Sequence, residues 1–449
     1  MRPAVYRGTV LHFLSDPGVE GEPGSWEVFE DGALAVGGDG LVRWAGEWSR
    51  LPDALRGEVI DHRGRLIVPG FVDAHVHYSQ YDAIAGFGAE LPEWMRRYVF
   101  PAERRFERRA HADLIAELFL DTLLANGTTT AAVHPTVHPA SVDAFGAAAV
   151  RRGMRMVCGK VLMDKRPEAP EFLCDSSVAE AERQTRELID RWHHTGRLGY
   201  AITPRFVPSS TDAQLAMAAE LVGEYPDLLL QTHAAENIPE TESVLARFPT
   251  ARSYVDVYDR LGMLGPGTLL AHCVHIDDRD RARLAATGTA IAFCPTSNLF
   301  LGSGLFDLAA ARRAGVRVGL GTDCGAGTSY SLLRTLNEAY KVVMSTESGR
   351  SEQLRLSALL GFYLATLGGA EALSLSDRIG SFRPGMEADF VVLDWAATPV
   401  LRRRVEVARD FEERLFALMI LGDDRAVKAT YVLGRRAYRR GAVPAGADR

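Results

Sequence analysis

Short apolar runs alternate with amphipathic segments through the middle of the chain. Eight runs rich in β-branched and other apolar residues lie between residues 71 and 323, and the stretches between them, such as 140–152 and 212–225, carry apolar residues at helical spacing. The eight runs span residues 71–77, 128–134, 154–162, 199–206, 228–233, 268–273, 290–294 and 316–322. Eight strands that alternate with helices predict an α/β protein with a (β/α)8 TIM barrel, in which functional side chains lie at the carboxyl ends of the strands.

The two ends of the chain show a different pattern. Short apolar alternations on either side of residues 37–40 predict a hairpin near the N-terminus. A turn followed by an apolar run at 384–394, and another such run at 427–434, repeat this texture near the C-terminus. We therefore expect residues 1–68 and 383–449 to form one small composite β-sandwich domain beside a barrel of residues 69–382.

A long connection follows the first predicted strand. Residues 79–106 include Gly86, Pro92 and Pro101 together with several aromatic residues, Trp94 among them. Such a length is unusual for a strand-to-helix connection in a compact domain. We expect this segment to form a lid or a substrate wall over the barrel mouth; the alternative is an irregular loop that only packs there.

Composition narrows the class of protein. The chain has 449 residues, 24% of them charged and 47% hydrophobic, which is typical of a globular protein. A net charge of −7 predicts no general attraction to nucleic acid or to an anionic membrane, and favours a small-molecule substrate. Arg7 and His12 interrupt the apolar residues at the N-terminus, so no signal peptide is predicted, and the expected location is the cytoplasm. The five cysteines form no CxxC pair, which argues against a disulfide scaffold and a thiolate zinc site.

The first predicted strand carries the first candidate chemistry. His75 and His77 are two residues apart, so they point to the same side of a strand and can bind one divalent cation together. Two nearby histidines can also be ordinary buried polar groups. Later strands decide between these interpretations, since His233, His272 and Asp323 each end an apolar run. All of them face the same mouth of a barrel, which favours a metal site.

These residues resemble the amidohydrolase superfamily of metal-dependent hydrolases. In that superfamily HxH on strand one, a histidine on strand five and an aspartate on strand eight hold the metal, which implies His75, His77, His233 and Asp323 as ligands. The terminal strands, including residues 380–393, are similar to its composite β-sandwich. Some branches bridge two metals with a lysine on strand four, where this chain has Arg205; Lys160 lies on predicted strand three. The resemblance therefore implies one ion, zinc, with iron as an alternative.

A finer resemblance is to the guanine deaminase branch of that superfamily. It rests on the motifs at residues 75–81 (HVHYSQY), 91–94 (LPEW), 98–103 (YVFPAE), 203–206 (TPRF), 233–237 (HAAEN), 294–298 (CPTSN) and 321–325 (GTDCG). It implies hydrolytic deamination of guanine to xanthine and ammonia by a metal-activated hydroxide that attacks C2, in a homodimer. The alternatives are a deaminase of another aminated heterocycle (a pterin, 8-oxoguanine or cytosine) and a non-catalytic barrel used as a scaffold.

Three residues are candidates for proton transfer. Glu236 follows His233 by three positions, so its carboxylate can reach both the attacking water and N3 of the ring; we interpret it as the proton shuttle. The alternative is an acid that stabilises the N-terminus of the next helix. His272 would orient or stabilise the hydroxide, and Asp323 can accept its proton. His134 and His138 are interpreted as structural, and Ser297 and Asn298 as residues behind the site.

Four further residues are candidates for substrate binding. The guanidinium of Arg205 can donate to O6 and N7, the acceptors by which arginine reads guanine in DNA. The alternative for Arg205 is an ion pair with an acid at the barrel mouth. Phe206, or an aromatic residue of the first loop such as Trp94, can stack on the ring. Gln80 offers a donor and an acceptor to the remaining polar edge.

Overall fold

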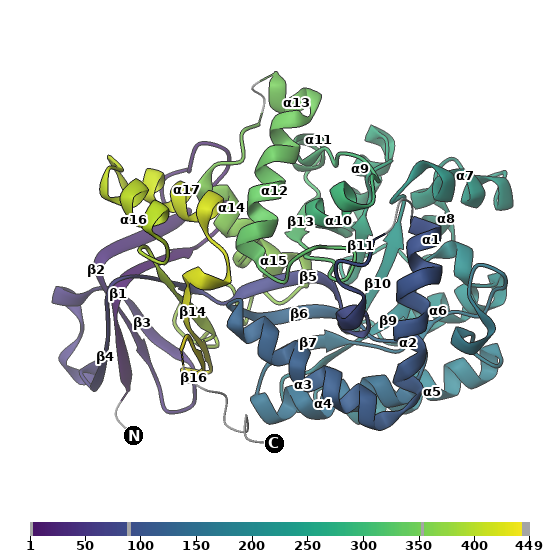
Figure 1. The fold of residues 1–449 in the computed structure, drawn as a ribbon, viewed down its shortest axis with the longest axis horizontal. Helices are drawn as coiled ribbons and strands as arrows, with labels where there is room; N and C mark the ends of the chain where they lie inside the picture. The colour runs from purple at the N-terminus through teal and green to yellow at the C-terminus, as the bar shows by residue number, and fades with distance from the viewer. Residues whose placement is uncertain (1–2, 88–90, 352–353, 442–449) are drawn as a thin grey trace.

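The computed structural model describes residues 3–87, 91–351 and 354–441, and every structural statement below concerns these residues. Nine parallel strands form the larger sheet, in the order β13-β12-β11-β10-β9-β7-β6-β5, with β8 paired to β9 (Figure 1). They are β5 (Phe71–His77), β6 (Thr128–His134), β7 (Arg155–Cys158), β8 (Val161–Leu162), β9 (Gly199–Pro204), β10 (Leu229–Ala234), β11 (Thr268–His272), β12 (Ala290–Phe293) and β13 (Arg317–Leu320).

Backbone hydrogen bonds close this sheet into a barrel. The Asp323 N–H donates to the His75 carbonyl over 2.8 Å, and the His77 N–H donates to the Cys324 carbonyl over 3.0 Å, which joins the segment after β13 to β5. Small and β-branched side chains such as Val72, Ala74 and Ala132 fill the interior. The predicted (β/α)8 barrel is confirmed.

Helices surround the barrel as the sequence predicts. The principal ones are α3 (Arg109–Ala125), α4 (Pro139–Arg152), α5 (Val178–Trp192), α6 (Asp212–Glu224), α7 (Ile238–Arg247), α8 (Tyr254–Arg260), α9 (Asp278–Thr287), α10 (Pro295–Phe300), α11 (Leu308–Arg313), α12 (Leu332–Ser345), α14 (Ala358–Leu364) and α15 (Leu367–Ala372). The Thr211 hydroxyl accepts from the Gln214 N–H at the start of α6, and Gly153 ends α4 with a positive φ of 64°.

Strand three differs from its prediction. The sequence predicts one continuous strand over 154–162, whereas the structure has β7 and β8 with a break at Gly159 and Lys160. The reason is close packing, since a Cβ at Gly159 would lie 1.7 Å from the Ala201 carbonyl oxygen. Lys160 therefore lies in the break, buried and paired with Asp175, rather than on a strand.

The second sheet combines both ends of the chain. Its order is β16-β15-β14-β4-β1-β2-β3, and Figure 1 shows the purple N-terminal strands beside the yellow C-terminal ones. The strands are β1 (Ala4–Phe13), β2 (Trp26–Val36), β3 (Val42–Glu47), β4 (Glu58–Pro69), β14 (Phe390–Asp394), β15 (Val427–Val432) and β16 (Arg435–Arg439). Antiparallel pairing of β4 with β14 joins the two halves. The composite β module is confirmed; residues 1–2 and 442–449 of its predicted range lie outside the described residues.

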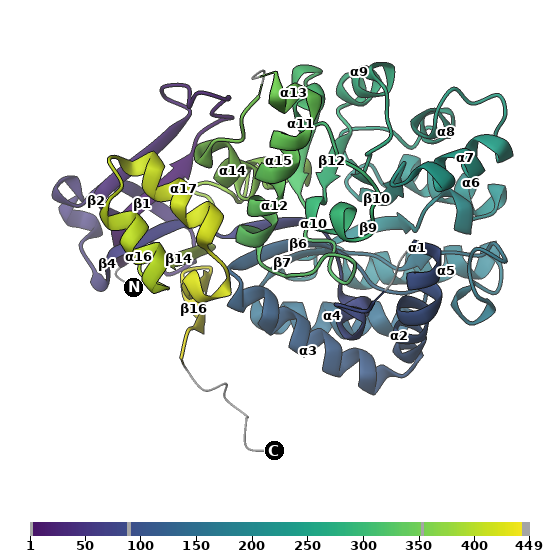
Figure 2. The same cartoon turned by 45° about the horizontal axis from the view of Figure 1, so that its top comes forward.

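Two further helices, α16 (Pro399–Glu406) and α17 (Phe411–Leu421), lie against this second sheet (Figure 2). The Phe411 ring stacks on Trp26 of β2 with 6.4 Å between ring centroids. None of the helices in the described part of the chain is long and apolar enough to cross a membrane.

The long first connection is folded rather than irregular. It contains the 3-10 helix η3 (Tyr78–Ala83), α1 (Leu91–Trp94), a π-helical turn over Met95–Val99, α2 (Phe100–Arg104) and η5 (Arg105–Glu107); residues 88–90 lie outside the described residues. Its apolar side chains pack against Val137, Val161 and Met163 beside the barrel mouth. This packing fixes the positions of Gln80, Trp94 and Glu103, which are all buried.

Candidate active site

Backbone conformation at the strand ends turns the candidate residues toward one point. His75 and His77 lie on β5, His233 on β10 and His272 at the end of β11, while Asp323 follows β13 by three residues. Of the eight non-glycine residues with positive φ in the described part of the chain, Ala235, His272, Cys273 and Asp323 lie at these strand ends. Such conformations cost free energy and cluster at functional sites.

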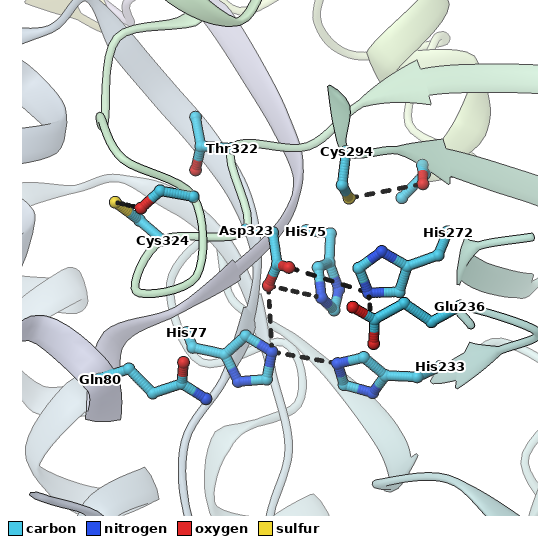
Figure 3. Close-up of polar contacts among 12 residues, drawn as sticks. His75, His77, Gln80, His233, Glu236, His272, Cys294, Thr322, Asp323 and Cys324 are labelled. Atoms are coloured by element: carbon cyan, nitrogen blue, oxygen red, sulfur yellow. Dashed lines mark hydrogen bonds and ion pairs between the residues drawn. The ribbon is translucent and has the colours of Figure 1, made fainter. Parts of the chain in front are cut away.

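Three imidazoles and one carboxylate converge at the mouth of the barrel (Figure 3). The Asp323 Oδ1 atom lies 3.2 Å from His75 Nε2 and 3.4 Å from His77 Nε2. His77 Nε2 and His233 Nε2 lie 3.1 Å apart. These are the four side chains that the sequence predicts as metal ligands, and the structure brings them together.

The protonation of these groups suits a divalent cation. His233 Nδ1 lies 2.7 Å from the Arg205 carbonyl oxygen, which can only accept, so the proton of the neutral ring is on Nδ1 and the Nε2 lone pair faces the cluster. Burial lowers the pKa of His75, and lowers the pKa values of His77 and His233 well below the ordinary histidine value. Neutral imidazole nitrogens beside a carboxylate are the donor set of a metal site. Two overlapping groups of these side chains are close enough together to hold an ion: His75, His233, His272 and Asp323, and His77, His134 and His233.

Two titratable groups lie next to this cluster. His272 Nε2 lies 3.8 Å from both Glu236 Oε2 and Asp323 Oδ2. On its other side His272 Nδ1 lies 2.9 Å from the Asn298 side-chain oxygen, which places the Nδ1 proton there. The Ser303 hydroxyl donates to Glu236 Oε1 over 3.2 Å. Both Glu236 and His272 are thus held by side chains from the segment after β12.

The environment raises the pKa values of Glu236 and His272. Burial raises the pKa of Glu236 above its ordinary value, although the nearby His272 opposes this shift. Burial alone would lower the pKa of His272, but the carboxylates of Glu236 and Asp323 raise it more, so the net shift is upward. A carboxyl group with a raised pKa keeps its proton closer to neutral pH, which suits general acid catalysis.

A cavity opens on these residues. Its lining includes all four predicted substrate-binding residues, namely Gln80, Trp94, Arg205 and Phe206, together with His77, His233, Glu236, His272 and Asp323. The indole N–H of Trp94 is buried and has no hydrogen-bond partner in the described part of the chain. An unpaired donor in a cavity wall is available to a ligand.

Arg205 makes the ion pair that the sequence left as an alternative. Both carboxylate oxygens of Glu103 lie 2.9 Å from Arg205 Nη1, and Glu103 Oε1 also accepts from Gln80 Nε2 over 3.2 Å. Arg205 nevertheless lines the cavity, so its other donors remain for a substrate. The ion pair and the substrate-binding role are compatible.

Sequence reasoning missed three residues near the site. Glu103 stands in a motif that carries the resemblance, but nothing in the sequence placed it against Arg205. No sequence pattern pointed to Ser303, because it lies in an irregular segment 67 residues from Glu236. His134 was set aside although it ends β6; its ring is fully buried, 4.7 Å from His77 and 5.0 Å from His233 between centroids. Its position at a strand end was the available signal.

Known proteins share this architecture. The model of the amidohydrolase family matches residues 66–437. The guanine deaminase of Escherichia coli (strain K12) is 49% identical over 415 residues, which cover 92% of each chain. Its solved structure superposes with a TM-score of 0.91 at 47% identity and covers 97% of this chain and all of that one.

A second solved structure bears on the cavity. Guanine deaminase from C. acetobutylicum, with guanine bound in its active site, has a TM-score of 0.87 at 29% identity and covers 97% of this chain and all of that one. With the family model spanning most of the sequence, the chain belongs to the amidohydrolase family and is similar to the guanine deaminases within it.

Proposed function

We propose that this protein hydrolyses guanine to xanthine and ammonia. The observation that carries the proposal is one cavity in which a metal-ligand cluster, the carboxyl group of Glu236 and the polar wall of Arg205 and Gln80 face each other. The relatives described above support the choice of guanine, since they bear the name of that activity.

His75, His77, His233 and Asp323 would hold one divalent ion. Nitrogen ligands with one carboxylate suit zinc, and iron is the alternative. A bound ion of this type supplies an acidified water as a nucleophile near neutral pH.

The chain's own residues would then move the protons. Glu236 donates a proton to N3 of the ring while the nucleophile adds to C2, and its raised pKa favours the protonated form that this step requires. Asp323 accepts the proton of the nucleophile. His272, held by Asn298, stabilises the negative charge beside Asp323 and Glu236. The proton on Asp323 then passes to the exocyclic nitrogen, which leaves as ammonia, while the proton of the C2 hydroxyl returns to Glu236 as the C2 carbonyl forms.

Side chains that line the cavity would orient the base. Arg205 donates to the O6 and N7 edge, where its donors match two acceptors. Phe206 and Trp94 line the same cavity and offer flat apolar surface to the ring. The Trp94 N–H, which has no partner among the described residues, adds a donor.

The test is the ultraviolet change as guanine becomes xanthine, followed for the wild type and Glu236→Gln side by side. Positioned acid/base groups contribute roughly 10²- to 10⁴-fold, so Glu236→Gln should lose about that factor in kcat while it retains its metal content. Glu242→Gln, an exposed position on α7, is the matched control and should keep full activity. Full activity of Glu236→Gln would refute the proposed shuttle, and greater ammonia release from a pterin, 8-oxoguanine or cytosine would refute the substrate.

The family resemblance also leads us to infer a homodimer in the cytoplasm that binds neither nucleic acid nor membranes. The net charge of −7 supports the absence of nucleic-acid binding, because the phosphate backbone repels an acidic protein. Sedimentation of the metal-loaded protein tests the assembly, and a single monomeric species at micromolar concentration would contradict it.

A further inference from the structure

We propose that Glu103 determines the base specificity of the site, by fixing which hydrogen-bonding groups Gln80 and Arg205 present to the substrate. This inference rests on the proposed deamination of guanine and goes beyond it. It concerns a residue of the folded first connection, which lies next to the two recognition residues and lines no part of the cavity itself.

The first evidence for this proposal is the set of contacts that Glu103 makes. Its side chain is 1% exposed, and it joins residues from three separate elements: α2, η3 after β5, and the segment after β9. Its two oxygens bind Arg205 Nη1 at 2.9 Å each, and Oε1 accepts from Gln80 Nε2 at 3.2 Å. A carboxylate paired with a guanidinium has no proton to donate, so Gln80 must turn its amide nitrogen toward Glu103.

The orientation of the amide decides what Gln80 offers to a ligand. With one N–H of the amide donated to Glu103, the amide oxygen points away from that carboxylate; it accepts no hydrogen bond from any described residue and is free to accept one from a ligand. Gln80 lines the cavity, and Figure 3 shows its side chain extending toward His77. Gln80 therefore presents an acceptor to the bound base.

The Glu103 carboxylate also determines which hydrogen-bond donors of Arg205 remain without a partner. Nη1 is committed to Glu103, while Nε and Nη2 have no hydrogen-bond partner within the described ranges. Arg205 is 5% exposed and lines the cavity, so these donors are available to a ligand. The wall thus offers donors from Arg205 beside an acceptor from Gln80.

This order of donors and acceptor matches one type of purine edge. Guanine has an acceptor at O6 and a donor at N1–H, which complement Arg205 and Gln80. A purine with an amino group at C6 has the reverse order, a donor at the amine and an acceptor at N1. Such a base would leave buried polar groups unpaired, and sites built on hydrogen bonds reject such analogues strongly.

The experiment compares guanine with 2,6-diaminopurine, which carries the same amine at C2 but the reversed edge. In Glu103→Gln the new side chain can donate or accept, so the amide of Gln80 is free to turn over. We expect kcat/KM for guanine to fall about tenfold or more, mostly through KM, and the preference for guanine over 2,6-diaminopurine to shrink at least about tenfold. Metal content should not change.

Two variants serve as controls. Glu107→Gln replaces an exposed acid of the same segment and should leave the preference unaltered. Gln80→Met removes the acceptor but keeps the pair of Glu103 and Arg205, so it should lower the preference even if Glu103→Gln fails to fold.

The outcomes separate this inference from the proposed function. An equal loss on both substrates in folded Glu103→Gln, or an unchanged preference in either Glu103→Gln or Gln80→Met, would overturn the role of Glu103. Absence of ammonia release from guanine by the metal-loaded wild type would instead refute the deaminase proposal.

Discussion

Arg205 combines a buried structural contact with the role in substrate binding that we propose for it. Its Nη1 atom binds both carboxylate oxygens of Glu103, and the residue also lines the cavity. Both partners are buried, so each depends on the other. Removing one partner of a buried ion pair leaves an uncompensated charge, which typically costs about 3–5 kcal/mol.

Arg205→Ala should therefore lose both activity and stability. We expect guanine turnover to collapse while metal content persists, and the free energy of unfolding to fall by about 3 kcal/mol or more because Glu103 is left buried without its partner. Metal analysis together with urea denaturation measures both effects. The double variant Arg205→Ala with Glu103→Gln should recover part of the stability but none of the activity; stability unchanged in Arg205→Ala would contradict the coupling.

At the scale of elements, the break in strand three is enforced by neighbouring backbone. Gly159 lies where β7 ends, and a side chain there would meet the Ala201 carbonyl of β9. The break leaves Lys160 inside the protein, where Asp175 neutralises it. Asp175 also accepts from Gln214 at the start of α6, over 2.8 Å, so this pair connects strand three to the next helix.

A methyl group at Gly159 should separate β7 from β9. We expect Gly159→Ala to destabilise the fold by about 3 kcal/mol or more, since backbone must move to relieve the overlap. Chemical denaturation measures the change. Gly223→Ala is the matched control, because nothing lies within 4 Å of its added Cβ and alanine favours the helix by about 0.5–1 kcal/mol. Equal stability of the two variants would refute the packing argument.

At the scale of the whole molecule, the second sheet is tied to the rest by buried polar groups. His12 on β1 is 3% exposed, lies 3.1 Å from the Ser381 hydroxyl and accepts from the Phe382 N–H over 3.3 Å. At the bottom of the barrel Arg197 pairs with Glu387 and Asp389. Residues from both chain ends and from the barrel must therefore be in place together.

Lowering the pH should reduce the free energy of unfolding through His12. Burial lowers the pKa of His12 to about 4, from 6.5 in an exposed histidine. The unfolded chain then binds a proton between pH 6.5 and 4 that the folded protein does not, so the stabilisation present above pH 6.5 is lost as the pH falls toward 4. We expect the free energy of unfolding to drop by about 1–2 kcal/mol more between pH 7 and pH 5 in the wild type than in His12→Gln. Equal pH slopes in urea denaturation would contradict this.

Much of the site could be predicted because the positions of its residues follow from local sequence patterns. Alternation along each strand determines which residues share a side, and parallel strands in a barrel bring their carboxyl ends to one mouth. That was sufficient to place His75, His77, His233, His272 and Asp323 together, and to predict the composite sheet from the strands near both chain ends. The same rule applied to β6 would have added His134.

Tertiary structure decided what no local rule contains. Glu103 meets Arg205 across 102 residues of sequence, Ser303 meets Glu236 across 67, and the break in strand three depends on a carbonyl of β9. Each of these contacts depends on how helices and loops pack over the strand ends, and packing depends on all the neighbours at once rather than on the periodicity of one segment. The sequence pattern by itself thus determined which side chains are candidate metal ligands, and the three-dimensional packing determined which residues contact and orient the side chains around them.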